Sequence, residues 1–303
     1  MSTQYPKIRV HSEGGHLLIR EGLSLCFYMH RPHVELRQAV TQSLETFLRI
    51  VGQQAFGIYT DEEGDWQDLD DAAWEHLRRE LVERRGLIIN LKHAEGSKKG
   101  FAFNYHGKPI DESFRGYRPE EASAVSFWLP TEYLEEHGPE RVRELALEVA
   151  APLPFTSGHV GLSFNNYPYD SKTWQELRKC CFRYPGMDIY DLSRYSNQIG
   201  TRVRGPSWMN FLGQPVLSEV GGVEGLQARL HSPGTTVQIL NGGRAVITLG
   251  PQPEAGDTEQ GHLLPAYREL ARVLEPWLFH EQNRRDLDFP AEDMLRWERR
   301  FLD

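Results

Sequence analysis

Long apolar runs are missing from this chain of 303 residues: no stretch approaches the ~20 apolar residues of a membrane-spanning helix, which excludes that class. Cysteine is scarce too, and Cys26, Cys180 and Cys181 form a poor disulfide framework. The segment 1–20 carries Glu13, two histidines and two glycines in place of the apolar core of a secretory signal. We therefore expect no membrane partner and a location in the reducing cytoplasm, with Cys180 or Cys181 buried as a small apolar residue.

An excess of basic side chains is also lacking. The chain has 34 Lys and Arg against 43 Asp and Glu, which gives a net charge of −9. Nucleic-acid binding draws its affinity from Lys and Arg that neutralise phosphates, so this balance argues against direct nucleic-acid binding and favours a basic partner. The apolar and charged fractions, 39% and 25%, are typical of a folded protein rather than a disordered one.

Common catalytic and cofactor-binding signatures do not occur either. The chain has no P-loop and no dinucleotide fingerprint, and Gly221–Gly225 lacks the Lys-Ser/Thr that ends a phosphate-binding loop. We expect that segment to connect helices, and we predict no cofactor. The nearest match to a Gly-x-Ser-x-Gly elbow, around Ser163, lacks the second glycine, so Ser163 is predicted to be an ordinary strand residue.

His30, His33 and Glu35 could in principle be metal ligands. Imidazole and carboxylate groups bind many divalent ions. Pro32 separates the two histidines, however, and no further ligand cluster lies nearby in the sequence. We therefore predict no metal site in the chain, and this segment is expected to join a strand to a helix.

Carboxylates that could act in acid–base catalysis are harder to exclude, because a sequence does not show how far apart they lie. Asp188, Asp191 and Asp257 are candidates, although Asp also caps helices and turns, and that structural role is favoured. His159 lies beside glycines on a predicted strand, where a hydrogen-bonded structural role is favoured. We predict no catalytic residue, and a hydrolase that uses His159 and dispersed carboxylates stays open as an alternative.

The order of elements predicts an α+β fold with a mixed or mainly antiparallel sheet flanked by helices. Strands are expected at 23–28, 55–59, 124–129 and 160–164, and helices at 36–51, 74–81, 142–149 and 174–181. Each half therefore has the order β-α-β-α, which suggests an internal duplication. The clearest trace of it is an apolar helical face that recurs at an offset of 100: Trp74, Leu77 and Leu81, then Trp174, Leu177 and Cys181.

After residue 200 the chain becomes rich in turns. Asn241, Gly242 and Gly243 tolerate positive φ, so they predict a hairpin between strands at 236–240 and 245–249. A helix is expected over 264–278, and a shorter one in the tail 292–303 that docks through Trp297 and Phe301. Because no long linker occurs, we predict one compact domain over 1–303. Two lobes, at about 17–120 and 121–280, with a tail at 281–303 are the alternative arrangement.

Five blocks in a fixed order resemble the type VI secretion immunity family, and the similarity covers roughly residues 20 to 280. The blocks are Gly158–Phe164 (GHVGLSF), Arg183–Ile189 (RYPGMDI), Gly205–Gly213 (GPSWMNFLG), Val237–Ile247 (VQILNGGRAVI) and Gly250–Asp257 (GPQPEAGD). Members of this family are cognate inhibitors of injected toxins, and some are paired with DNA-cleaving toxins of the virus-type replication-repair nuclease class. The resemblance implies a noncatalytic immunity protein that binds its toxin and occludes it. An adaptor or structural module of the secretion apparatus is a further alternative.

An acidic segment is the feature with most bearing on a partner. Seven carboxylates fall within eleven residues: Asp61, Glu62, Glu63, Asp65, Asp68, Asp70 and Asp71. Clustered like charges repel one another unless water or a cation relieves them, so the segment is expected at the surface. We predict that Asp61, Glu62, Glu63, Asp65 and the anchor Trp66 bind the toxin, whose surface there would be basic. The alternative is a solvated loop before a helix whose dipole favours Asp70 and Asp71.

Overall fold

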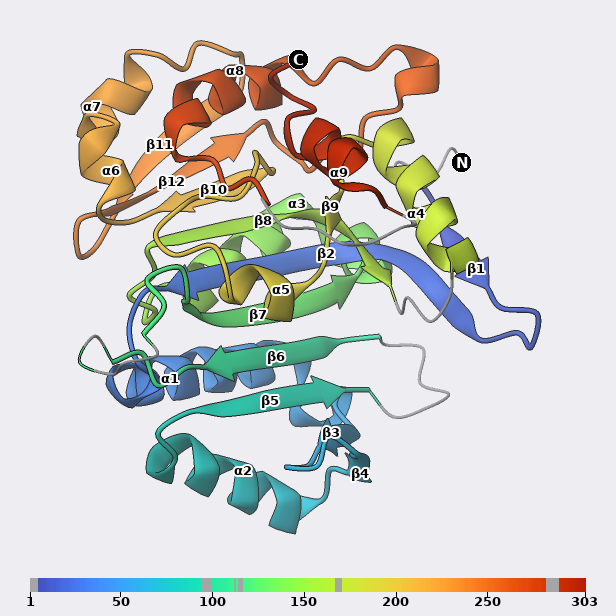
Figure 1. The fold of residues 1–303 in the computed structure, drawn as a ribbon, viewed down its shortest axis with the longest axis vertical. Helices are drawn as coiled ribbons and strands as arrows, with labels where there is room; N and C mark the ends of the chain where they lie inside the picture. Colours follow the sequence, from blue (N-terminus) through green and yellow to red (C-terminus); the bar gives the residue numbers. More distant parts are fainter. Residues whose placement is uncertain (1–4, 94–99, 112, 114–116, 167–170, 282–288) are drawn as a thin grey trace.

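The computed structural model describes residues 5–93, 100–111, 113, 117–166, 171–281 and 289–303. Within these ranges, one sheet holds twelve strands in the order β11-β12-β10-β8-β2-β7-β6-β5-β3-β4, with β1 added to β2 and β9 to β8 (Figure 1). The strands are β1 (Arg9–His11), β2 (Leu17–Met29), β3 (Ile58–Thr60), β4 (Trp66–Asp68), β5 (Leu87–Lys92), β6 (Ala102–Gly107), β7 (Ser123–Pro130), β8 (Ser157–Asn166), β9 (Asp188–Ile189), β10 (Met209–Leu212), β11 (Thr235–Leu240) and β12 (Arg244–Leu249).

Helices flank this sheet, which confirms the predicted α+β class. The α-helices are α1 (His33–Val51), α2 (Asp71–Glu83), α3 (Thr131–Ala150), α4 (Ser171–Arg183), α5 (Leu192–Ser196), α6 (Val216–Glu219), α7 (Gly222–Gln227), α8 (Pro265–Leu274) and α9 (Ala291–Glu298). Short 3-10 turns are η1 (Gln53–Ala55), η2 (Thr258–Gln260) and η3 (Glu275–Trp277). The described pairings are antiparallel except that of β8 with β9, so the sheet is mainly antiparallel, as expected.

The centre of the sheet is the long strand β2, which pairs with β7 on one side and β8 on the other. Alternate side chains of a strand point to opposite faces, and here both faces are covered. Phe27 packs into the core beneath α1 and α3, where Phe47 and Phe127 meet with ring centroids 4.8 Å apart. Cys26 and Tyr28 face the opposite side, in a smaller cluster with residues of α5. Burial on both faces explains why β2 is apolar along most of its length.

The two predicted β-α-β-α units are similar in their helices but not in their strands. Helices α2 and α4 occur at the expected offset, and the apolar positions of both pack on the core. Asp70 caps α2 by accepting a hydrogen bond from the backbone N–H of Ala73. The strand predicted at 55–59 begins only at Ile58, because residues 53–55 form the turn η1. Strands of both units interleave in one sheet, and the division into lobes stays a prediction.

The predicted hairpin after residue 200 is confirmed as β11 and β12, with Gly242 and Gly243 at φ 74° and 66° in the turn. The predicted long helix is shorter than expected: α8 ends at Leu274, and the turn η3 follows, since Pro276 cannot continue the α-helical hydrogen bonding. The tail forms α9, and both Trp297 and Phe301 are buried, as expected.

Toward the β4 edge, the helices in the described part of the chain cover one side of the sheet only. Ile89 and Leu91 of β5 pack against the apolar face of α2 and the core around α1. The alternating residues Ile88, Asn90 and Lys92 face the other way, and Ile88 is 61% exposed. Helix α5 covers β6 and β7 on this second face but not β5 (Figure 1). The acidic segment lies at this partly open end of the molecule.

Candidate functional site

The first part of the acidic segment, Asp61 to Asp65, forms the turn of the β3–β4 hairpin, residues 58–68, which we call the acidic hairpin. Asp70 and Asp71 lie at the start of α2. Asp61 organises this turn: its Oδ1 accepts hydrogen bonds from the backbone N–H groups of Glu63 (3.0 Å) and Asp65 (2.9 Å). Its Oδ2 accepts a third from the Gln67 amide (2.8 Å). These bonds, that of Gln67 first, lower the pKa of Asp61. Asp61 therefore shapes the turn, a role that the sequence alone did not reveal.

The other acidic residues of the turn differ in what they contact. Glu62, Glu63 and Asp65 are exposed. Glu62 is paired with Arg84 at the end of α2, whereas Glu63 and Asp65 form no ion pair within the described part of the chain. Carboxylates at the tip of a hairpin that form no ion pair within the chain are available to a cationic partner. Of the four predicted acidic contacts, Glu63 and Asp65 are thus the best placed for one.

Trp66 begins β4 directly after the turn and is 42% exposed. The Lys92 ammonium lies 3.8 Å from the centre of its ring, within the range of a cation–π contact. Burial lowers the pKa of Lys92 to about 8. Trp66 also borders a hollow lined in part by Asn90 and Asn104, whose side-chain amides are joined by a hydrogen bond. The indole is therefore held in place on one side while it presents apolar surface to solvent.

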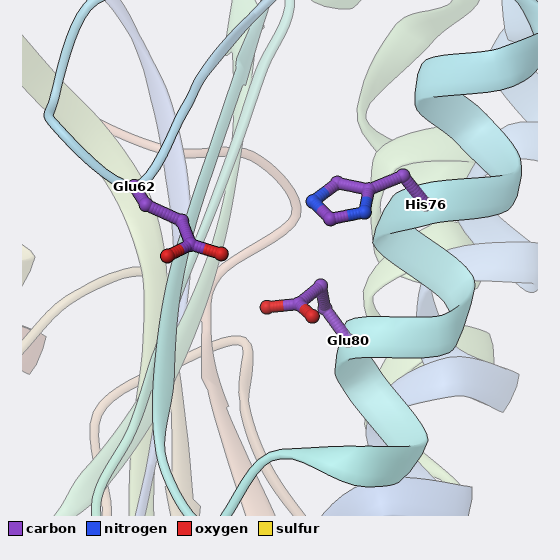
Figure 2. A group of neighbouring side chains, drawn as sticks. All are labelled: Glu62, His76 and Glu80. Atoms are coloured by element: carbon purple, nitrogen blue, oxygen red, sulfur yellow. The ribbon is translucent and has the colours of Figure 1, made fainter.

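A second hollow lies between the acidic hairpin and α2. Glu62, His76 and Glu80 border it, and one ligand atom from each lies within 4.8 Å of the others (Figure 2). Sequence reasoning did not single out His76 and Glu80. Their i, i+4 spacing on a helix that follows an acidic turn is the signal that could have found them.

The histidines and glutamate near residue 30 are held apart by separate contacts. The buried His33 accepts from the Tyr105 hydroxyl at Nδ1 (2.7 Å) and donates from Nε2 to the Leu81 carbonyl (3.1 Å). His30 bonds to the Pro119 carbonyl, and Glu35 pairs with Arg31. Burial lowers the pKa of His33 to about 4, so the ring is neutral. Both of its nitrogens already have partners, which agrees with a structural role.

His159 and Asp188 do come together, but in the interior. Nε2 of His159 lies 3.3 Å from Oδ2 of Asp188, and Arg204 donates to Oδ1 at 2.7 Å. The exposed fractions of the three residues are 3%, 7% and 4%. The guanidinium of Arg204 also lies 3.6 Å from the centre of the Tyr195 ring. This buried ionic cluster joins β8, β9 and α5 and lies in the core.

The remaining candidates have local structural roles. Asp191 caps α5 by accepting from the backbone N–H of Arg194, and Asp257 caps η2 while it pairs with Arg183. Ser163 is buried within β8, as predicted. Gly221 lies between α6 and α7, as expected for a connection between helices, but Gly222 and Gly225 belong to α7 itself, so most of the glycine-rich segment is helical.

The cysteines are free thiols. Cys26 and Cys181 are buried and Cys180 is partly buried. The prediction that at least one of the adjacent pair serves as a small apolar residue is confirmed. None of the helices in the described ranges is both long and apolar enough to span a membrane.

A model of type VI immunity proteins matches residues 39–301, which is most of the chain, so the protein belongs to this class of toxin inhibitors. The matching family, TsiV, is the type VI immunity family for VRR-NUC nuclease toxins. This confirms the resemblance seen in the sequence blocks.

The fold is also similar to a solved structure, that of the Pseudomonas aeruginosa T6SS protein PA0821. The TM-score is 0.79 at 19% identity, and the match covers 99% of this chain and 88% of that one. At this identity the likeness shows a shared fold. A search of curated proteins finds no relative.

Proposed function

We propose that this protein neutralises its cognate nuclease toxin by tight one-to-one binding, with no catalysis of its own, and that the acidic hairpin contacts a basic surface of the toxin. The family match over residues 39–301 carries the first part of the proposal. A nuclease must attract DNA phosphates with Lys and Arg, so its substrate groove offers a surface complementary to carboxylates. The cytoplasm, where the DNA target lies, is the proposed site of action, and three free thiols suit that compartment.

The hairpin combines the two features that a protein-binding surface needs. Glu63 and Asp65 are exposed charges that can accelerate encounter, and Trp66 beside them is an aromatic anchor. Docking there would place carboxylates where DNA phosphates otherwise bind and would exclude the substrate sterically. The competing hydrolase hypothesis needs an accessible His159, which instead lies in the core.

The proposed function can be tested in cells that express the toxin encoded next to this protein. Co-expression of the protein should restore growth, and the two chains should copurify. An immunity protein cognate to a different toxin serves as the control and should not protect. If growth stays arrested and no complex forms, the proposal is wrong.

Charge removal at the hairpin tip tests the binding surface separately. We expect Glu63→Gln with Asp65→Asn to slow association roughly 3- to 10-fold at low salt and to flatten its salt dependence, because two steering charges are lost. The dissociation rate should change little. Stopped-flow association measured over a range of salt concentrations gives both quantities.

A matched control removes two exposed charges elsewhere, Glu136→Gln with Glu140→Gln on α3. It makes the net charge of −9 less negative by the same two units and leaves the hairpin intact. If both pairs of substitutions slow association equally, total charge rather than the hairpin steers the toxin.

A further inference from the structure

The hollow between the acidic hairpin and α2 has a volume of about 470 Å³. Figure 2 shows that Glu62 enters it from the loop, while His76 and Glu80 enter it from adjacent turns of the helix. One oxygen of each carboxylate and one ring nitrogen lie within 4.8 Å of one another. Three metal-binding groups from two different elements thus meet at one point.

Their placement follows from the local structure. Trp74, Leu77 and Leu81 turn one face of α2 to the core, which leaves His76 and Glu80, one helical turn apart, at the border of the hollow. Glu62 lies directly after Asp61, whose three hydrogen bonds hold the turn in shape. The three donor groups are therefore presented by backbone that is already ordered.

The two carboxylates already hold a cation jointly. The Arg84 guanidinium forms ion pairs with both Glu62 and Glu80. Its side chain is 42% exposed, so rotation into water costs little, as for other surface ion pairs. The His76 ring, by contrast, forms no hydrogen bond with any residue that the structure describes. The hollow therefore has a third donor that Arg84 does not use.

We propose that Glu62, His76 and Glu80 bind a divalent transition metal of the Zn²⁺ class, and that Arg84 moves into solvent when the metal binds. One imidazole and two carboxylates are a ligand set that Zn²⁺ accepts, with water in the remaining position. Mg²⁺ prefers oxygen ligands alone and keeps its own waters, so it is the wrong ion for this site. The bound metal would tie the acidic hairpin to α2. This inference does not depend on the toxin, since the isolated chain is sufficient to test it.

Calorimetric titration of ZnCl₂ into chelator-treated protein tests the site. We expect one Zn²⁺ per chain, with affinity reduced more than about 100-fold by His76→Ala and strongly by Glu80→Gln. His262→Ala, which removes an exposed histidine elsewhere, should bind like the wild type. Absence of a Zn²⁺ signal, or equal binding by His76→Ala and the wild type, overturns the proposal.

Arg84 supplies a second, independent test. Because its guanidinium competes with the metal for both carboxylates, Arg84→Gln should bind Zn²⁺ roughly 3- to 10-fold more tightly. Thermal unfolding without metal verifies that each variant is folded, and added Zn²⁺ should raise the melting temperature of Arg84→Gln more than that of the wild type. Weaker binding by a folded Arg84→Gln, or equal stabilisation by Mg²⁺, contradicts the competition and overturns the site.

Discussion

Asp188→Ala is expected to lower the free energy of unfolding by about 3–5 kcal/mol, because it leaves the Arg204 guanidinium in the core without its closest carboxylate. The two side chains are 2.7 Å apart, and Arg204 is 4% exposed. Glu298, at 3.9 Å, is too distant to replace the lost hydrogen bond. Urea denaturation of the two proteins measures the difference.

The control is Asp65→Ala, which removes an exposed carboxylate and should change stability by no more than about 0.5 kcal/mol. Equal stability of Asp188→Ala and the wild type would show that the buried ionic cluster does not stabilise the fold.

The same cluster makes stability depend on pH. Burial alone would raise the pKa of Asp188, but Arg204 and the hydrogen bond from His159 outweigh it and hold the pKa well below its usual range. A carboxyl with a depressed folded-state pKa stabilises the protein above its unfolded pKa of about 3.9, and this contribution is lost as pH falls toward the folded-state value. The stability difference between wild type and Asp188→Ala should therefore shrink below about pH 4. A difference that is constant across this range contradicts the assignment.

Trp66→Ala should weaken toxin binding by at least about 2 kcal/mol, or roughly 30-fold in Kd, if the indole is the anchor of the interface. Most of the effect should lie in the dissociation rate, because truncation removes buried contact area without changing the charge. Surface plasmon resonance with immobilised toxin measures both rates. Trp66→Phe should recover part of the affinity.

Leu263→Ala is the matched control, since Leu263 is 70% exposed and lies far from the hairpin in sequence. Thermal unfolding of Trp66→Ala shows whether loss of the stack on Lys92 also affects the fold. A folded Trp66→Ala protein that binds the toxin like the wild type would place the interface elsewhere.

Sequence periodicity predicted the main elements because their signals are local. The central strands, α1, and the hairpin around Gly242 all carry their own apolar pattern or turn residues. Strand β4 was not predicted, since Trp66, Gln67 and Asp68 form a short polar strand that depends on pairing with β3. The order of the strands in the sheet could not be predicted from the sequence either, because β2 pairs with β7 and β8, which lie far from it along the chain.

The candidate site was predictable in composition but not in the roles of its residues. The clustered charges predicted that the acidic segment lies at the surface. Only the structure shows that Asp61 accepts the hydrogen bonds that stabilise the turn and that Glu62 forms an ion pair with Arg84. His159 and Asp188 were both considered from the sequence. Their contact depends on where the short strand β9 lies against β8, with Asp188 opposite Ser163, and Arg204, their main partner, carried no sequence signal.

Titration of the purified toxin's DNA-cleaving activity with this protein tests noncatalytic blockade most directly. Activity should fall linearly and vanish at one inhibitor per toxin, and dissociation of the complex should return active toxin. Full inhibition by a small fraction of an equivalent, with toxin that stays inactive after removal of the protein, would mean that the protein modifies the toxin chemically and would contradict the proposed mechanism.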